Sequence, residues 1–324
     1  ESSKDFAKAF MKKYGIPTAQ YQTFENAEKA HEYVNQKGAP IVIKADGLAA
    51  GKGVVVAATL HEAHVAIDDM LLGNKMGNAG ARVVIEDFLR GEEASFIVMV
   101  DGDNVLPMAT SQDHKRLLDD DCGPNTGGMG AYSPAPVVTS DVYERAMNEI
   151  ILPTVNGMKE EGHKFTGFLY AGLMIDKTGA PYTVEFNCRF GDPETQPIMS
   201  RLNSDLVDLL EAAIDGKLNS TIAEWNPQTA VGVVLAAENY PDTPKKGDII
   251  TGLDEADRIG KVFHAGTALN ENGKVVTNGG RVLCVVGLGD NVAAAKTKAY
   301  QAVQKISFDG MQYRKDIADK AINH

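Results

Sequence analysis

The sequence predicts an α/β protein, with α+β regions, that is built from two or three domains. At 324 residues the chain is too long for one ordinary compact core. Strand-like and helix-like segments alternate between residues 21 and 91. Beyond Trp225 the pattern changes to several strands followed by one long helix, which predicts a separate C-terminal domain.

The composition is that of a soluble globular protein and argues against nucleic-acid binding. Apolar residues make up 44% of the chain and charged residues 23%. Lysine and arginine number 32 against 44 acidic residues, so the net charge is −12 and the pI is near 5.1. A protein that binds a nucleic-acid backbone needs clustered basic charge. A small phosphorylated substrate, held by a few local cations, remains compatible with this balance.

The cysteines and the apolar runs indicate a cytoplasmic protein without a membrane segment. Cys122, Cys188 and Cys284 lie far apart and have no C-x-x-C spacing, which fits a reducing cytosol. No apolar run approaches the roughly 20 residues that span a bilayer. The chain begins at Glu1 and Ser2 already resembles a helix cap, so we expect a further segment upstream.

Local patterns place the helices and strands of three regions. A first helix, capped by Ser2 or Ser3, runs to Tyr14, where Gly15 and Pro17 end it. The small α/β region has expected strands at 21–24, 40–45, 54–58 and 82–89 and helices at 25–36 and 60–72. The next region has expected strands at 94–100, 104–110, 168–175 and 182–187, helices at 141–159 and 205–215, and a functional loop at 113–136. The C-terminal region has expected strands at 231–237, 261–265, 274–277 and 281–286 and a helix at 291–306.

A Gly-rich stretch lies between two of these strands. Gly47, Gly51 and Gly53 surround Lys52, and Lys44 leads in from the preceding strand. Glycine lets backbone N–H groups approach phosphate oxygens closely, and lysine adds positive charge. The glycine spacing and the strand that follows both differ from a Walker loop. The stretch therefore predicts a hairpin flap over phosphates, and a hairpin tip without a function is the open alternative.

The strand at 182–189 carries acidic and amide groups on one face. Period-2 alternation places Thr183, Glu185, Asn187 and Arg189 on one face and Tyr182, Val184, Phe186 and Cys188 on the other, which we expect to be buried. Glu185 and Asn187 are then about 6.5 Å apart. That spacing suits Mg²⁺ bound together with nucleotide phosphates. Arg189 could neutralise a phosphoryl group or hold a carboxylate, and Asp192 and Glu194 add acids nearby. An ordinary solvated strand face is the alternative.

The segment 125–130 offers a second anion site. Asn125 and Thr126 are followed by Gly127 and Gly128, so several free backbone amides could fold into an anion-binding nest. Upstream, residues 113–116 form a mixed-charge cluster. An ordinary surface turn explains the same residues equally well on spacing alone.

Four motifs together resemble the glycinamide ribonucleotide synthetase family, the phosphoribosylamine–glycine ligases of the ATP-grasp superfamily. The motifs are residues 43–54, 85–93, 123–132 and 185–197. The resemblance covers the whole chain, and the last two motifs are the most specific. It implies an ATP-grasp fold with a lid at 21–91, a central domain at 1–20 and 92–224, a C-terminal α/β domain at 225–324, and the family's N-terminal domain absent.

The resemblance also implies an activity and the residues that perform it. ATP phosphorylates glycine to glycyl phosphate, which 5-phosphoribosylamine attacks to give glycinamide ribonucleotide, ADP and phosphate in purine biosynthesis. The implied ATP-binding residues are Lys4, Lys44, Gly51, Lys52 and Gly53 for phosphates, Glu86, Asp87, Phe88 and Leu89 for adenine, and Glu93 for ribose. The implied ligands of Mg²⁺ (or Mn²⁺) are Glu185 and Asn187. We expect catalysis to involve Arg189, Asn125 and Asp192, and substrate binding to involve Asp113, Thr126, Gly127, Gly128, Gly130, Pro193 and Glu194.

The chain departs from the family pattern in two ways. The strand at 171–174 has no second acid, so part of the metal shell is not identified. The family's N-terminal domain, which helps bind phosphoribosylamine, does not precede Glu1 in this sequence. Two alternatives therefore stay open: another ATP-grasp carboxylate–amine ligase, and a non-catalytic nucleotide-binding fragment.

Overall fold

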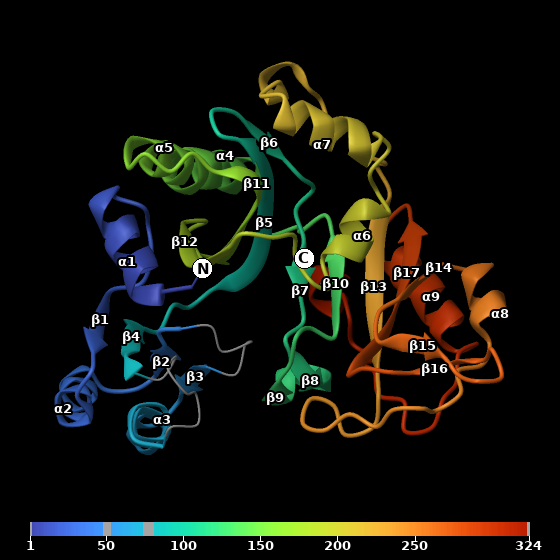
Figure 1. Cartoon of the computed structure of the whole chain (residues 1–324), viewed down its shortest axis with the longest axis horizontal. Helices are drawn as coiled ribbons and strands as arrows, with labels where there is room; N and C mark the ends of the chain where they lie inside the picture. The colour runs from blue at the N-terminus through green and yellow to red at the C-terminus, as the bar shows by residue number, and fades with distance from the viewer. Residues whose placement is uncertain (1, 48–52, 74–80, 323–324) are drawn as a thin grey trace. The chain divides into compact units, whose positions relative to one another are not determined.

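The structure, a computed structural model, describes residues 2–47, 53–73 and 81–322 (Figure 1). The chain divides into two compact units. Unit 1 comprises Glu1–Glu93, Ser140–Phe165 and Ala171–Cys188, and unit 2 comprises Ala94–Thr139, Thr166–Tyr170 and Arg189–His324. Strands β5 (Glu92–Asp101) and β11 (Thr166–Ile175) each contribute residues to both units.

Unit 1 begins with a helix and a small α/β layer, as the sequence predicts. Its elements are α1 (Lys4–Lys13), β1 (Tyr21–Phe24), α2 (Ala27–Lys37), β2 (Ile41–Ala45), β3 (Val54–Ala57), α3 (Leu60–Leu71), β4 (Val83–Asp87), α4 (Ser140–Arg145), the π-helix η3 (Ala146–Ile151), α5 (Leu152–Glu160) and β12 (Pro181–Asn187). The antiparallel sheet has the order β1-β4-β2-β3, and α2 and α3 cover one of its faces (Figure 1). Its core includes Val34, Ile43, Ile67 and Ile85.

Side-chain caps fix where the helices of unit 1 begin. The hydroxyl of Ser3 accepts a hydrogen bond from the Phe6 amide at 3.1 Å, so Ser3 rather than Ser2 caps α1. Asn26 and Thr59 cap α2 and α3 in the same way. Each cap satisfies a backbone N–H that the first helical turn leaves without a partner.

Unit 2 is built on a five-stranded antiparallel sheet in the order β14-β17-β13-β10-β7. The strands that lie wholly in unit 2, inside and outside this sheet, are β6 (Val105–Pro107), β7 (Gln112–Asp113), β8 (Arg116–Leu118), β9 (Cys122–Asn125), β10 (Gly130–Ser133), β13 (Thr229–Ala236), β14 (Lys261–His264), β15 (Thr267–Leu269), β16 (Val275–Thr277) and β17 (Arg281–Gly289). Its helices are η2 (Asp119–Asp121), α6 (Thr195–Met199), α7 (Leu206–Ile214), η4 (Leu218–Ser220), α8 (Leu253–Asp257), α9 (Val292–Val303) and α10 (Asp319–Ile322).

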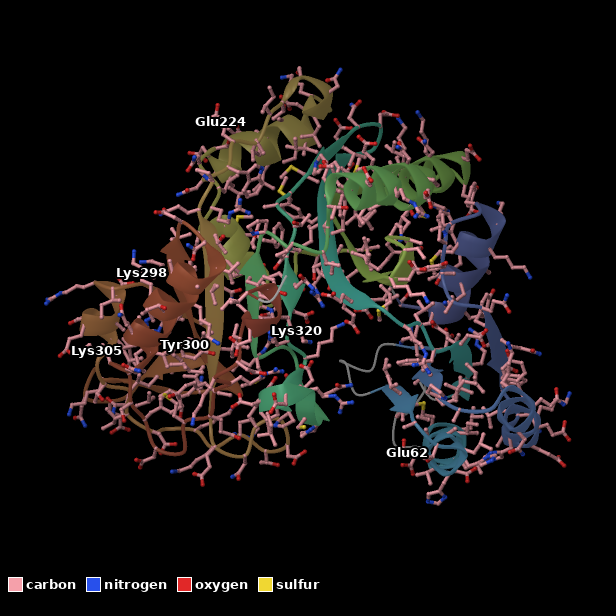
Figure 2. All side chains as sticks on the ribbon, turned by 180° about the vertical axis from the view of Figure 1, so that it is seen from behind. Glu62, Glu224, Lys298, Tyr300, Lys305 and Lys320 are labelled. Atoms are coloured by element: carbon pink, nitrogen blue, oxygen red, sulfur yellow. The ribbon has the colours of Figure 1, made fainter. Side chains whose placement is uncertain are left out.

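Helix α9 covers β13 and β17 with a face of alanines (Figure 1). Ala295, Ala299 and Ala302 are fully buried against the sheet, whereas Lys298 is exposed on the outer side of the helix (Figure 2). A Cβ on Gly287 would lie 2.4 Å from the backbone of α9, so glycine at this position permits the close helix–sheet approach. The strands and the long helix expected beyond residue 225 are present, and the sheet formed by β13, β14 and β17 also includes β10 and β7 from earlier in the chain.

The predicted loop at 113–136 is wrong in its central part. This segment contains β8, β9 and β10, and β10 is a fully buried strand that pairs with β7 and β13. The polar and Gly-rich sequence concealed this, because β10 has only four residues and its burial comes from distant strands. No helix within the described ranges has the length and apolar sequence needed to cross a bilayer.

Candidate functional site

Two lysines of unit 1 lie beside the end of β2. Lys4 donates to the carbonyl oxygens of Ala45 at 2.7 Å and Gly47 at 3.1 Å. Lys44 is only 6% exposed and donates to the Val184 carbonyl at 3.2 Å. Burial lowers the pKa of Lys4, and the charge of Lys44 lowers it further, because the two ammonium groups share one environment. A group with negative charge would relieve this repulsion, so the chemistry of this pair, here called the lysine cradle, suits an anion.

The register of β2 and β4 places the Glu86 carboxylate beside the Lys44 ammonium. Val42 is paired with Glu86 and Lys44 with Val84, so Lys44 and Glu86 are diagonal neighbours on one face. The Lys44 Nζ lies 2.8 Å from Glu86 Oε1, and both side chains are less than 10% exposed. The other Glu86 oxygen lies 2.9 Å from Lys8 Nζ. Sequence reasoning missed Lys8, whose only signal was its place on the inner face of the first helix.

Asp46 anchors the start of the Gly-rich stretch to α1. Its carboxylate accepts hydrogen bonds from the Asp5 amide at 2.7 Å, Arg82 Nη2 at 2.8 Å and Ser3 Oγ at 3.1 Å. Burial alone would raise its pKa, but these bonds lower it, so the carboxylate is ionised. The Lys4 amide also donates to the Asp46 carbonyl at 3.1 Å. These contacts, which the sequence did not reveal, fix the position of Lys4.

The predicted flap is an antiparallel hairpin as far as the described residues extend. Lys44 pairs with Val54, and the Ala45 amide donates to the Gly53 carbonyl at 2.8 Å. A strand follows Gly53, as expected for a hairpin and not for a Walker loop. Gly51 and Lys52 lie outside the described residues.

The segment expected to contact adenine comprises the last two residues of β4, Glu86 and Asp87, and the two residues that follow it. Glu86 is buried, whereas Asp87 is half-buried and pairs with Lys37 at 3.0 Å. The Asp87 amide already donates to the Gln20 carbonyl at 2.9 Å. Phe88 and Leu89 are half-buried and Glu93 is exposed.

Strand β12 carries the two expected metal ligands. Glu185 is exposed, Asn187 is half-buried, and Asn187 Nδ2 donates to Glu185 Oε1 at 3.3 Å, so their side chains share a face. A carboxylate and an amide oxygen are the hard ligands that Mg²⁺ prefers. The expected burial of the opposite face is wrong, because Cys188 is exposed and the other three residues of that face are only half-buried, whereas Thr183 of the polar face is fully buried. β12 is the edge strand of its sheet, where inside and outside are less distinct.

The segment 125–130 of unit 2 is not an open nest. The amides of Thr126, Gly127, Gly128 and Met129 donate to Lys115 O, Tyr240 Oη, Thr126 Oγ1 and His114 O at 2.7 to 3.0 Å. The prediction of several free amides is therefore wrong. The glycines serve the close packing of this segment instead, and Asn125 remains exposed at its start.

Arg281, at the start of β17, joins two motifs of unit 2. Its Nη1 donates to Gly127 O at 2.7 Å and to Asp192 O at 3.1 Å, and its Nη2 lies 2.6 Å from Asp192 Oδ2. A Cβ on Gly128, whose φ is +117°, would lie 2.3 Å from Pro193 Cδ. The two sequence motifs that are most specific in the resemblance are thus in direct contact, and no motif in the sequence pointed to Arg281.

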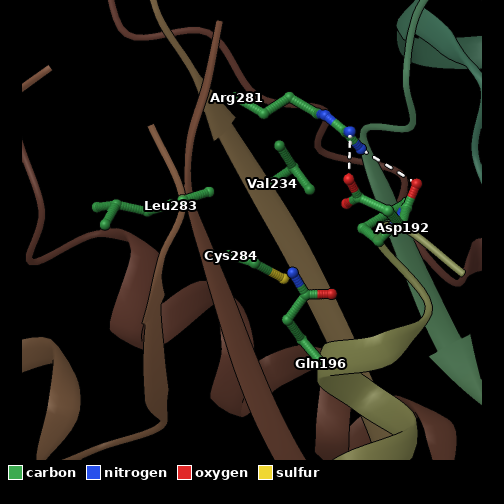
Figure 3. Close-up of a pocket in the computed structure, with 8 residues that line it drawn as sticks. Asp192, Gln196, Val234, Arg281, Leu283 and Cys284 are labelled. Atoms are coloured by element: carbon green, nitrogen blue, oxygen red, sulfur yellow. Dashed lines mark hydrogen bonds and ion pairs between the residues drawn. The ribbon is translucent and has the colours of Figure 1, made fainter. Parts of the chain in front are cut away.

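A cavity of about 280 Å³ lies beside this contact (Figure 3). Its lining is polar at Asp192, Arg281 and Gln196, and apolar elsewhere, at Pro193, Val234, Ala265, Leu283 and Cys284. The buried Oε1 of Gln196 has no hydrogen-bond partner in the part of the chain that the structure describes. Burial raises the pKa of the Cys284 thiol to about 12, so it is protonated and unsuited to nucleophilic catalysis.

The remaining predicted residues of unit 2 lie in different environments. Glu194 is 2% exposed and accepts a hydrogen bond from Ser95 Oγ at 2.7 Å, so one of its oxygens is bound within the protein. Gly130 is buried in β10, and Asp113 is half-buried in β7. Arg189 is exposed and donates to the Phe190 carbonyl at 2.9 Å.

Two family models match the chain. The ATP-grasp (A) domain of phosphoribosylglycinamide synthetase matches residues 2–195, and the C domain matches residues 230–320. The chain belongs to the phosphoribosylglycinamide synthetase family. The resemblance inferred from the four motifs is confirmed.

Relatives in this family are close. A phosphoribosylamine–glycine ligase of Neisseria meningitidis serogroup B is 86% identical over 323 residues, covering 100% of this chain and 76% of the relative. The Ralstonia nicotianae protein of the same name is 67% identical over 322 residues, covering 99% of this chain and 76% of the relative. The chain thus spans about three quarters of the length of these family members.

Solved structures agree on the ATP-grasp fold. The phosphoribosylamine–glycine ligase of Thermotoga maritima has a TM-score of 0.90 at 42% identity, covering 98% of this chain and 79% of that chain. A biotin carboxylase domain from Hydrogenobacter thermophilus, solved with ADP, its magnesium salt and bicarbonate, has a TM-score of 0.69 at 17% identity. The match covers 96% of this chain and 67% of that chain. At that identity the second likeness shows the fold alone.

Proposed function

We propose that this chain catalyses the ATP-dependent ligation of glycine to 5-phosphoribosylamine, which gives glycinamide ribonucleotide, ADP and phosphate in purine biosynthesis. The 86% identity to a phosphoribosylamine–glycine ligase is the observation that carries this proposal. The lysine cradle and the Glu185–Asn187 pair supply groups of the chemistry that it requires. A cytoplasmic location and a lid at 21–91 follow from the same proposal.

The ATP phosphates would be held by Lys4 and Lys44. Within the described residues each ammonium has two protein acceptors, so each retains a third N–H for a ligand oxygen. Gly51, Lys52 and Gly53 would cover the phosphates from the flap. The segment from Glu86 to Leu89 would contact adenine, and Glu93 would hold the ribose hydroxyls.

The donor set on β12 fits a divalent metal ion. Within residues 2–47, 53–73 and 81–322, no group of three or more His, Cys, Asp or Glu side chains could hold a metal. Two oxygen ligands are sufficient for Mg²⁺, which takes its other ligands from water and nucleotide phosphates. Glu185 and Asn187 would therefore hold Mg²⁺ (or Mn²⁺), which neutralises charge on phosphate oxygens when bound.

The substrates would be held in unit 2, where Arg281 joins the segments around Gly127 and Asp192. Arg189, Asn125 and Asp192 would contact the reacting groups. The surrounding substrate residues would be Asp113, Thr126, Gly127, Gly128, Gly130, Pro193 and Glu194. Thr126, Gly127 and Gly128 would act by packing rather than by donating to a substrate, because their amides are bonded within the protein. Among these, Glu194 would act by fixing the segment that follows Asp192, because its side chain is buried against Ser95. The cavity beside Arg281 offers both charged and apolar walls to a small polar substrate.

The reaction has two steps. A carboxylate oxygen of glycine attacks the γ-phosphorus of ATP, the bond to the bridging oxygen breaks, and ADP leaves. The amine of phosphoribosylamine then attacks the acyl carbon of glycyl phosphate, inorganic phosphate leaves and the amine loses a proton. The lysines stabilise the charge that moves onto phosphate oxygens. No nucleophilic side chain is required, because the glycine carboxylate and the amine are themselves the nucleophiles.

The test is glycine- and amine-dependent release of ADP. The chain is assayed alone and in a version extended at its N-terminus to the length of its relatives, with a panel of carboxylic acids and amines. ADP release that requires both glycine and phosphoribosylamine, with glycinamide ribonucleotide as product, is the expected result. Turnover with a different acid–amine pair would assign another ligase activity. ATP binding without turnover in both versions would favour the non-catalytic alternative.

A further inference from the structure

Lys8 is a buried lysine of unit 1 that the proposed function does not use. It lies on α1, and its side chain is 2% exposed. Its ammonium contacts Glu86 Oε2 at 2.9 Å, Thr18 Oγ1 at 2.8 Å and the Ala19 carbonyl at 3.1 Å. An ammonium has three N–H groups, so all of them are occupied and none remains for a ligand.

Lys8 and Lys44 bind the same carboxylate from opposite oxygens. Glu86 Oε2 faces Lys8 and Glu86 Oε1 faces Lys44, at 2.9 and 2.8 Å. If Lys8 were absent, the Glu86 carboxylate could turn both oxygens toward Lys44. Lys44 would then use the N–H that is otherwise left for a ligand, because an ammonium and a carboxylate form the strongest available bond in a dry site.

The same network reaches the strand that carries Glu185 and Asn187. Thr18 Oγ1, which accepts from Lys8, donates to the Thr183 carbonyl at 2.7 Å. Lys44 donates to the next carbonyl along β12, that of Val184. Lys8 is therefore bonded to Glu86 on one side and linked to β12 on the other.

We propose that Lys8 is a positioning residue of the nucleotide site. By occupying one oxygen of Glu86, it leaves Glu86 a single oxygen for Lys44 and keeps one Lys44 N–H directed at an ATP phosphate. This inference rests on the proposed role of Lys44 in ATP binding. Burial lowers the pKa of Lys8, and Glu86 opposes that effect, which fits a charge kept in place by its partner.

The experiment measures the Kd of ATP by calorimetry on this chain, at fixed Mg²⁺. Lys8→Met should weaken ATP binding by roughly 10- to 100-fold, the factor that one charge-assisted bond represents. The matched control is Lys13→Met on the same helix, which loses an exposed ion pair to Glu161 at 2.8 Å and should bind ATP as the parent chain does. Circular dichroism and thermal unfolding establish that each variant is folded.

Lys44→Met separates the inference from the proposed site. It should weaken binding by at least as much as Lys8→Met, and adding Lys8→Met to it should change the Kd by less than about twofold, because Lys8 acts through Lys44. Additive effects, or an unchanged Kd in Lys8→Met, would overturn the inference and leave the site intact. An unchanged Kd in Lys44→Met would overturn the site and the inference together.

A second comparison covers the case in which Lys8→Met fails to fold because it leaves a buried carboxylate half-paired. The double variant Lys8→Met, Glu86→Gln contains no lone buried carboxylate. If Lys8 acts only through Glu86, the Kd of ATP for this double variant equals the Kd for Glu86→Gln alone. A weaker affinity in the double variant would show that Lys8 acts on the nucleotide by another route and would overturn the inference.

Discussion

The guanidinium of Arg281 lies 2.6 Å from the carboxylate of Asp192, and the same side chain donates to the Gly127 carbonyl. Arginine can make these contacts at once because its N–H groups form a rigid, planar fork. The contact joins two segments of unit 2 that are far apart in the sequence.

Replacing Arg281 should therefore impair substrate use. Lysine keeps the charge but cannot span both acceptors, so we expect Arg281→Lys to lower kcat/KM for glycine by roughly tenfold or more while the KM for ATP stays near its original value. Steady-state kinetics with each substrate varied in turn measures this. Arg145→Lys, which alters a surface pair with Glu149 at 2.8 Å, is the control. Equal losses for ATP and glycine would contradict a local role.

Gly128→Ala should damage the same contact from the other side. The φ of +117° disfavours alanine, and the new Cβ would overlap Pro193 Cδ at 2.3 Å. We expect roughly tenfold or greater loss of kcat/KM and a lower unfolding temperature. Gly162→Ala is the matched control, because its φ is +83° but no atom lies within 4 Å of the added Cβ. If both variants lose the same activity, the Pro193 contact is not the cause.

Glu185→Gln tests the metal assignment. The change keeps the shape of the side chain but removes the charge that holds a cation, so we expect kcat to fall by roughly 10- to 100-fold and the Kd of ATP to change less. Raising the Mg²⁺ concentration should restore part of kcat. Glu161→Gln, which alters the exposed pair with Lys13, serves as the reference. An unchanged kcat in Glu185→Gln would remove Glu185 from the metal site.

The lowered pKa of His114 predicts how the free energy of unfolding changes with pH. Burial, followed by the charge of Arg314, lowers its pKa from 6.5 to about 4. Between these values the unfolded chain binds a proton that the folded chain does not, so stability rises with pH in this window. The part of the free energy of unfolding that comes from keeping His114 neutral is complete above pH 6.5 and is lost as pH falls toward 4. At about 1.4 kcal/mol per pH unit, it amounts to about 3 kcal/mol.

Denaturant unfolding at pH 7.0, 5.5 and 4.5 measures this contribution. The loss of stability between the first and last condition should be smaller in His114→Gln, which has no titrating ring. The carboxyl of Asp316 is distinguishable. Burial opposes its ionisation, but the hydrogen bonds from Arg314 and the Asp120 amide hold its pKa below the usual range, so its contribution to stability is lost only at lower pH. An identical pH profile in His114→Gln would refute the assignment.

Much of the fold could be predicted because its signals are local. The strands β2, β3 and β4 and the helices α2 and α3 were expected from periodicity, and the caps Asn26 and Thr59 mark where the helices begin. Strand β10 was missed because its four residues, Gly130–Ser133, include only one large side chain, Tyr132, and therefore carry little periodic signal. Its burial depends on pairing with β7 and β13, which no local pattern encodes.

The candidate site shows the same division. Lys44, Glu185 and Asn187 were named from residue type and motif, and Lys4 from the family resemblance; the structure brings Glu185 and Asn187 into contact. The amides of segment 125–130 were expected to be free because a sequence does not show which distant acceptors will reach them. Tyr240, which binds the Gly127 amide, is one such acceptor.

The sequence by itself determined the family of this protein, its helices and most of its strands, and the residue types available for binding phosphate and metal. These depend on spacing along the chain, which the sequence displays directly. Only the tertiary structure decided which side chains share a partner: Lys8 and Lys44 on Glu86, and Gly127 and Asp192 on Arg281. Hydrogen bonds and ion pairs act over about 3 Å. Such contacts depend on strand register and packing between distant segments, and spacing along the chain does not specify them.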